Sequence, residues 1–203
     1  MNRLPVAAAA VVVALALTAC DPVTGTLVGA GATASVAMVQ ERGGRQAAID
    51  TSTNVGINER LLKKDHVLFG RVNVTVVENR VLLTGVVPKQ EDRDEASRLS
   101  WMGENVTEVL NELQVTGSTG IVDAARDTWV TTQLRAKMVG DKQVVDINYS
   151  LECVNGTVYL FGIGQSQAEV ERVIDYARAL TNVRRVVSHV MLKDDPRRKK
   201  SPA

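Results

Sequence analysis

The sequence predicts an α+β protein made of two tandem domains, each a three-stranded sheet covered by two helices. The first observation is an internal repeat: shifted by 77 residues, the chain aligns with itself without gaps, and residues 81–86 fall on residues 158–163. The second is that the apolar spacing is kept across the repeat while polar residues change. The third is the order of patterns in each unit, which is helix, strand, strand, helix, strand.

In the second unit, Asp127 or Thr128 is predicted to cap a helix that runs through residue 140. Asn155-Gly156 is the dipeptide favoured in a two-residue type I′ hairpin. Three strands are expected in this unit, at residues 144–154, 157–163 and 183–192.

The second helix of each unit also has a start signal. Ser166 and Glu169 form a capping-box pattern that opens a helix to about residue 179. In the first unit, Glu78-Asn79 takes the place of the hairpin turn, and Pro88 begins a helix that ends near Gly103.

Two glycines occupy the same place in the repeat. Gly85 and Gly162 each follow the core of the second strand. A chain that leaves a strand for a helix at this point needs a positive φ or a close backbone approach, both of which favour glycine. We therefore expect these two positions to be structural.

The N-terminus has the features of a secretory signal. Residues 1–3 are positively charged, and residues 6–16 form an uncharged run that is too short for a membrane span. The run ends in Leu17-Thr18-Ala19-Cys20, which resembles the lipobox of bacterial lipoproteins, so residues 1–19 are predicted to be removed and Cys20 to be lipidated. An ordinary secretory signal with a nearby cysteine is the alternative.

The residues after Cys20 concern where the protein is anchored. Residues 20–49 are rich in Gly and Ala and are predicted to be a tether, with a membrane-associated or partly helical segment as the alternative. The domains are expected at 50–116 and, with a short linker, 117–192, followed by a basic disordered tail at 193–203. A lipid anchor facing the periplasm is expected, with the outer membrane favoured. Asp21 resembles the enteric retention signal for the inner membrane and keeps that membrane as the alternative.

The charge distribution argues against nucleic-acid binding. The whole chain has a formal charge of +1, residues 50–115 carry 8 basic and 11 acidic residues (net −3), and residues 121–192 carry 8 of each. The tail adds 5 basic and 2 acidic residues, so any attraction to an anionic surface lies in the C-terminal half. We expect the run from Arg197 to Lys200 to be a solvated end, with help in binding an anionic surface as the alternative.

Trp129 is the most informative side chain of the second unit. On a helical wheel at about 100° per residue, it lies about 140° from the middle of the apolar stripe of Val130, Leu134 and Met138. It should therefore lie at the flank of the helix or outside the core. An exposed indole near cationic side chains suits the lipid interface. The alternative is that Trp129 fills a contact between the two domains.

The repeat, the strand ends of the form V-x-L-x-G, the lipobox and the hexad of residues 127–132 together resemble the BON-domain family of bacterial envelope proteins. The resemblance covers residues from about 50 to 192 together with the signal. It implies anionic phospholipid as partner, support of outer-membrane integrity and no known catalysis. It further implies that the first helix of the second unit contacts the membrane. On the helical wheel Gln133 and Ala136 share the side of Trp129, whereas Arg135 and Lys137 lie elsewhere around the helix. The candidate lipid-binding residues are therefore Trp129, Gln133, Arg135, Ala136 and Lys137.

The first unit lacks these features. The positions 77 residues before Trp129, Arg135 and Lys137 are Ser52, Asn58 and Arg60. With its net negative charge, this unit is expected to be a spacer or a docking site for another protein. Trp101 is expected to pack in the core or between domains. The alternative function is a protein-interaction adaptor for envelope assembly proteins or peptidoglycan-associated partners; the oligomeric state is left open.

No catalytic or metal site is predicted. The sequence has no phosphate-binding glycine loop, no nucleophile elbow and no HExxH motif, and its two histidines do not have metal-ligand spacing with cysteine. Cys153 lies in a predicted strand and is expected to be a small core residue. The acidic cluster at residues 91–95 is expected to be a solvated helix start. We expect no cofactor.

Overall fold

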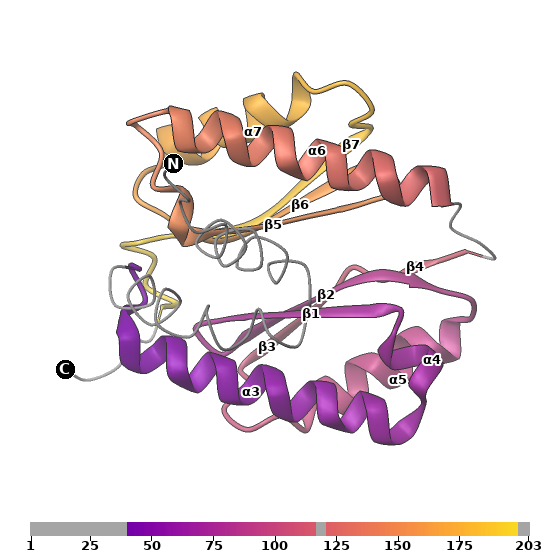
Figure 1. Cartoon of the computed structure of the whole chain (residues 1–203). Helices are drawn as coiled ribbons and strands as arrows, with labels where there is room; N and C mark the ends of the chain where they lie inside the picture. The colour runs from indigo at the N-terminus through magenta and orange to yellow at the C-terminus, as the bar shows by residue number, and fades with distance from the viewer. Residues whose placement is uncertain (1–39, 117–120, 199–203) are drawn as a thin grey trace, which may run out of the picture.

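The computed structural model describes residues 40–116 and 121–198. The predicted signal peptide, Cys20 and most of the tether lie outside the described residues. Two α+β domains follow one another, which confirms the predicted fold class. Figure 1 shows them as four layers: the two sheets face each other in the middle, and the helices of each domain cover the outer face of its own sheet.

Domain 1 consists of α3 (Gly43–Lys64), α4 (His66–Phe69), β1 (Val72–Val77), β2 (Arg80–Val87), α5 (Gln90–Trp101), β3 (Glu108–Asn111) and β4 (Gln114–Val115). β1 pairs antiparallel with β2, whereas β3 and β4 both run parallel to β2. The third strand is thus interrupted at Glu112 and Leu113, and Leu113 is buried in the core. α3 begins before residue 50, so the folded domain extends into the predicted tether.

Domain 2 consists of α6 (Ile121–Gly140), β5 (Tyr149–Val154), β6 (Thr157–Gly164), α7 (Gln167–Arg178) and β7 (Arg185–Leu192). A short 3₁₀ turn, Asp146–Asn148, replaces the first part of the predicted strand 144–154. β6 lies between antiparallel β5 and parallel β7. The prediction that Asp127 or Thr128 caps the first helix was wrong, because α6 begins earlier and both residues lie within it. Ser166 does cap α7, accepting a hydrogen bond from the Glu169 amide.

Both hairpins turn through two residues in the left-handed region. Glu78 and Asn79 have φ of 51° and 65°, and Asn155 and Gly156 have φ of 50° and 73°. Gly85 and Gly162 have φ of +126° and +140°. A Cβ atom on either glycine would lie about 2 Å from the carbonyl oxygen of Arg71 or Asn148, respectively. The expected need for glycine is therefore confirmed at both positions, since positive φ and close approach occur together.

Three apolar clusters hold the described residues together. One lies between sheet and helices in each domain, and in domain 2 it includes Val130, Leu134 and Met138, all fully buried. The third lies between the two sheets, and its buried members are Val77, Leu82, Tyr159, Phe161 and Ile163. β6 is buried along its whole length because its two faces contribute to two different clusters. The two sheets thus form a packed interface.

Polar contacts at the rim of this interface join the domains further. The Arg80 guanidinium lies 5.1 Å from the centroid of the Phe161 ring and donates to Glu108 and to the His189 carbonyl. The Gln114 side chain donates to the Val154 carbonyl at 3.0 Å. Because these residues come from opposite sheets, they fix the mutual position of the two domains.

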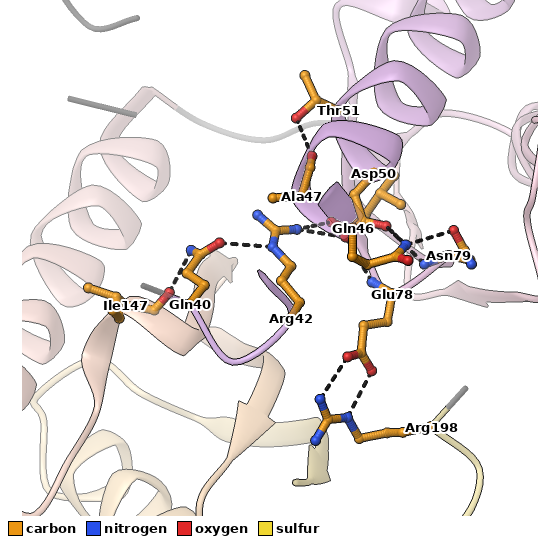
Figure 2. A network of polar contacts seen from close by, with 11 residues as sticks. Gln40, Arg42, Gln46, Ala47, Asp50, Thr51, Glu78, Asn79, Ile147 and Arg198 are labelled. Carbon is orange, nitrogen blue, oxygen red and sulfur yellow. Dashed lines mark hydrogen bonds and ion pairs between the residues drawn. The ribbon is translucent and has the colours of Figure 1, made fainter. Parts of the chain in front are cut away.

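Both ends of the described chain also contact the interface (Figure 2). Gln40 donates to the Ile147 carbonyl of domain 2, and Arg198 forms two hydrogen bonds with the Glu78 carboxylate, at 2.7 and 2.9 Å. The Arg198 side chain is only 4% exposed. We expected a disordered tail from residue 193, but residues 193–198 have defined positions. Arg198 is paired internally and is not available to an anionic surface.

Candidate functional site: the outer face of α6

α6 presents an unusual outer face. Its inner residues are buried against the sheet, whereas the Trp129 side chain is 61% exposed and Val139 is 65% exposed. Ala125, Thr132 and Ala136 lie on the same outer side and are also exposed. At about 100° per residue, these five side chains form a continuous stripe along the helix. The prediction that Trp129 lies outside the core is confirmed.

Lys137 lies at the flank of this stripe. Its ammonium nitrogen is 5.8 Å from the centroid of the Tyr176 ring on α7. Tyr176 in turn donates to an Asp141 oxygen at 2.6 Å, and this hydrogen bond holds the pKa of the Asp141 carboxyl below its usual range. The aromatic ring therefore restricts Lys137 without neutralising its charge.

The five residues predicted to contact lipid do not all lie together. Trp129, Ala136 and Lys137 are exposed on the outer face, and Gln133 is half-buried beside them. Arg135 points toward the sheet: its guanidinium donates to the carbonyl oxygens of Asp146 and Tyr149 at 3.0 and 3.2 Å. Arg135 thus positions the start of β5 and lies apart from the other four.

Sequence reasoning missed two residues of this face. Arg126 is exposed on the same flank as Lys137 and makes a 3.4 Å contact with Asp123, whose side chain is itself partly exposed. Val139 extends the apolar stripe toward the C-terminal end of α6. The signal for both is helical periodicity taken over the whole of α6.

The repeat has a structural counterpart near the hairpin turns. Asp127 accepts hydrogen bonds from the amides of Asn155 and Gly156, at 2.6 and 2.8 Å, and from the Cys153 thiol at 3.2 Å. Asp50, its equivalent in domain 1, accepts from the amides of Glu78 and Asn79 (Figure 2). The aspartate of the hexad therefore holds the turn of the hairpin and does not belong to the outer face.

Cys153 is a structural residue. It packs against the core of domain 2, and burial together with the nearby Asp127 carboxylate raises the pKa of its thiol to about 12. A thiol with so high a pKa is a poor nucleophile at neutral pH. Among residues 40–116 and 121–198, no three His, Cys, Asp or Glu side chains are placed to hold a metal ion. None of the described helices has the length and apolarity needed to cross a bilayer.

Domain 1 has an exposed tryptophan of its own. Trp101 is 53% exposed at the end of α5, beside Met102, which is 54% exposed. The expectation that Trp101 packs in a core or between domains was wrong. Its position on α5 lies opposite the buried residues Ala96 and Leu99. The first turn of the same helix carries Glu91 and Asp92, whereas its last turn carries Arg98, which is paired with Glu95 and donates to the Met102 sulfur at 3.4 Å.

Two tandem αββαβ domains joined through their sheets define a double-domain module of the BON type. The chain belongs to the BON-domain family, since the BON domain model matches residues 50–117 and 126–194.

Curated relatives match this chain over different lengths. A protein encoded in the gshII 5′ region of Anaplasma centrale is 37% identical over 145 residues, which are 71% of this chain and 95% of the relative. The outer membrane lipoprotein DolP of Haemophilus influenzae is 37% identical over 119 residues, 58% of this chain and 61% of that protein. Osmotically-inducible protein Y of Escherichia coli is 27% identical over 146 residues, 71% of this chain and 73% of the relative.

Proposed function

We propose that this protein is a non-catalytic envelope lipoprotein that is anchored through Cys20 and binds anionic phospholipid through the outer face of α6. The observation that carries the proposal is the exposed stripe around Trp129, flanked by the cations Arg126 and Lys137. An indole at headgroup level is favourable, and each Lys or Arg near an anionic surface contributes about 1 kcal/mol. The similarity to a protein named as an outer membrane lipoprotein supports an envelope location and a role at the outer membrane.

The lipid-binding part of the proposal can be tested with an internal control. Residues 20–203 carrying Cys20→Ser are sedimented with vesicles of anionic or neutral phospholipid, so that no acyl chain contributes. Trp129→Ala should weaken binding to anionic vesicles roughly tenfold, because a large apolar side chain no longer leaves water. Trp101→Ala is the matched control, since it removes a comparably exposed indole from domain 1, which has a net charge of −3 over residues 50–115. Equal binding by both variants would contradict the proposal.

A second candidate function rests on Trp101 and Met102. An exposed aromatic and a flexible thioether are enriched at protein interfaces. The net charge of −3 over residues 50–115 opposes contact of this domain with an anionic membrane. Domain 1 therefore supports an adaptor role in which it docks an envelope protein while domain 2 contacts lipid. Loss of a protein partner in Trp101→Ala with unchanged vesicle binding would establish this division.

A further inference from the structure

The two domains differ in how the edges of their sheets are closed. β1 and β5 are the edge strands on one side of each sheet, and such strands offer unpaired backbone groups to other chains. In domain 1 two of these groups have partners: the carbonyl oxygens of Val74 and Val76 accept hydrogen bonds from Asn54 at 2.6 Å and Arg42 at 3.1 Å. Side chains of the first helix and of its N-cap thus occupy these two carbonyls at the edge of β1.

β5 leaves part of its edge open. Its two-residue turn makes Val154 and Thr157 a hydrogen-bonded pair, so the alternate residues Leu151 and Cys153 direct their backbone groups away from β6. The Tyr149 carbonyl follows the same alternation and is taken up by Arg135. Within the described part of the chain, the outward backbone groups of Leu151 and Cys153 have no hydrogen-bond partner.

The internal repeat explains the difference at Leu151. A shift of 77 residues places Asn54 on Thr131 and Val74 on Leu151. The Asn54 amide reaches across to the strand, whereas the Thr131 hydroxyl donates back to the Thr128 carbonyl of its own helix at 2.9 Å. The side chain that closes the edge in domain 1 therefore has no counterpart in domain 2.

A cleft of about 690 Å³ lies beside this open edge. α6 forms one wall, and domain 1 forms the other where β1 begins and β2 ends. Its volume lies within the range of about 300–1,000 Å³ that is usual for binding sites. Most of the uncharged side chains on these two walls are small, and Arg71 and Val86 are larger residues beside them. The small ones are Gly70, Gly85, Ala124, Thr128 and Thr131.

Glu152 adds a negative charge to the cleft, which favours a positively charged ligand. Its side chain lines the cleft and forms no ion pair with a basic residue in the described structure, and burial raises its pKa despite a hydrogen bond with the Asn73 side chain. Arg71 lines the same cleft, so its lining holds one cation against the two carboxylates of Glu152 and Asp127. The other carboxylate in the cleft, Asp127, already accepts three hydrogen bonds from the hairpin. A cation opposite Glu152 would compensate its charge, and oppositely charged side chains on adjacent strands attract one another.

We propose that the open edge of β5 binds an extended basic segment of a partner protein by strand addition, with a Lys or Arg side chain opposite Glu152. Main-chain hydrogen bonds to Leu151 and Cys153 hold the segment, and the contact with Glu152 selects its charge. This surface is separate from the outer face of α6, so both can be occupied at once.

The probe is a capped, fluorescent peptide, Thr-Thr-Val-Lys-Val-Thr-Thr, added to residues 20–203 carrying Cys20→Ser. We expect saturable anisotropy and slower hydrogen exchange at the amides of Leu151 and Cys153. Glu152→Gln should weaken binding several-fold, whereas Glu171→Gln on α7 should leave it unchanged. Thr131→Asn places the side chain used in domain 1 beside β5, and should weaken binding at least tenfold while the folded spectrum is kept.

Several results would overturn the proposal. If a peptide with Glu in place of Lys bound equally well, Glu152 would not select a basic segment. If Thr131→Asn bound the peptide as well as the parent does, the peptide would not bind at the edge of β5. Slow exchange at both amides without peptide, lost when residues 21–39 are deleted, would show that the chain's own segment occupies the edge. Slow exchange that depends on protein concentration would show that a second copy does.

Discussion

The outer helices of the two domains present similarly exposed tryptophans in domains of different charge. Trp129 on α6 has Arg126 and Lys137 at its flank, whereas Trp101 ends α5 in a domain with a net charge of −3 over residues 50–115, and Arg98 in the last turn is paired with Glu95. Both indoles are more than half exposed. Exposure alone thus does not distinguish them, and the charge around each one decides which surface it can approach.

The two equivalent aspartates that hold the hairpin turns, Asp50 and Asp127, also differ in their surroundings. Asp50 is 1% exposed and pairs with Arg42 as well as with two backbone amides, whereas Asp127 is half-buried and accepts two amides and a thiol. The repeat has thus kept the structural role of the aspartate. What has changed is the burial around it, and domain 2 has become the more open copy at its edge strand.

The largest effect is expected from removing these aspartates. Asp50→Ala leaves the Arg42 guanidinium without its carboxylate, and should lower the free energy of unfolding by about 3–5 kcal/mol, as when one partner of a buried pair is removed. Asp127→Ala should cost only about 1–3 kcal/mol, because it leaves unpaired backbone amides but no buried cation. Urea denaturation measures both. If Asp127→Ala lowered the free energy of unfolding more than Asp50→Ala does, this expectation would be wrong.

The repeat predicted the fold because both copies keep the same apolar spacing and the same two-residue turns. The packing of sheet on sheet could also have been anticipated. Tyr159, Phe161 and Ile163 make β6 apolar on both faces, which is typical of a strand covered on both sides. The capping prediction at Asp127 failed because a short acidic side chain can accept hydrogen bonds from the amides of a helix start or from those of a hairpin turn. Only tertiary contacts decide which of the two roles it has.

The site was predictable in part. Wheel geometry placed Gln133 and Ala136 on the side of Trp129, and Lys137 elsewhere around the helix, because these orientations depend only on helical periodicity. It could not show that Arg135 reaches backbone carbonyls of the strand start, since that depends on the path of the chain after α6. Composition alone does not indicate the exposure of Trp101, because tryptophan is more often buried than exposed; its position on α5, opposite Ala96 and Leu99, is what places it outside the core.

In domain 2, Arg135 is a structural cation and Lys137 is a surface cation, so their variants should have different effects. Arg135→Ala removes hydrogen bonds to two carbonyl groups and should lower the free energy of unfolding by about 1.5–3 kcal/mol, the value for hydrogen bonds to charged groups. Binding of the folded variant to anionic vesicles should not change. Thermal unfolding and vesicle sedimentation of the same sample check the two expectations. If Arg135→Ala were as stable as the parent but bound anionic vesicles more weakly, Arg135 would belong to the lipid-contacting surface.

Lys137→Ala should show the reverse pattern. Its ammonium makes no ion pair in the described structure, so its loss should leave stability within about 0.5 kcal/mol of the parent. Binding to anionic vesicles should fall about fivefold at low salt, which corresponds to about 1 kcal/mol for one cation near the surface. The difference should shrink as salt is added, because exposed charges are screened. An equal deficit at low and high salt would show that the charge of Lys137 is not what matters.

The smallest expected effect tests whether a tryptophan alone can convert domain 1 into a lipid-binding copy. Ser52 is exposed on α3 at the position equivalent to Trp129. Ser52→Trp should raise binding to anionic vesicles less than about twofold, since the net charge of −3 over residues 50–115 opposes approach to the surface. Neutral vesicles provide the control, because the repulsion is absent there. If the tryptophan of Ser52→Trp increased binding to anionic vesicles as much as Trp129 does, an indole at this helix position would be enough for lipid binding. The cations of domain 2 would then have no part in selecting anionic lipid.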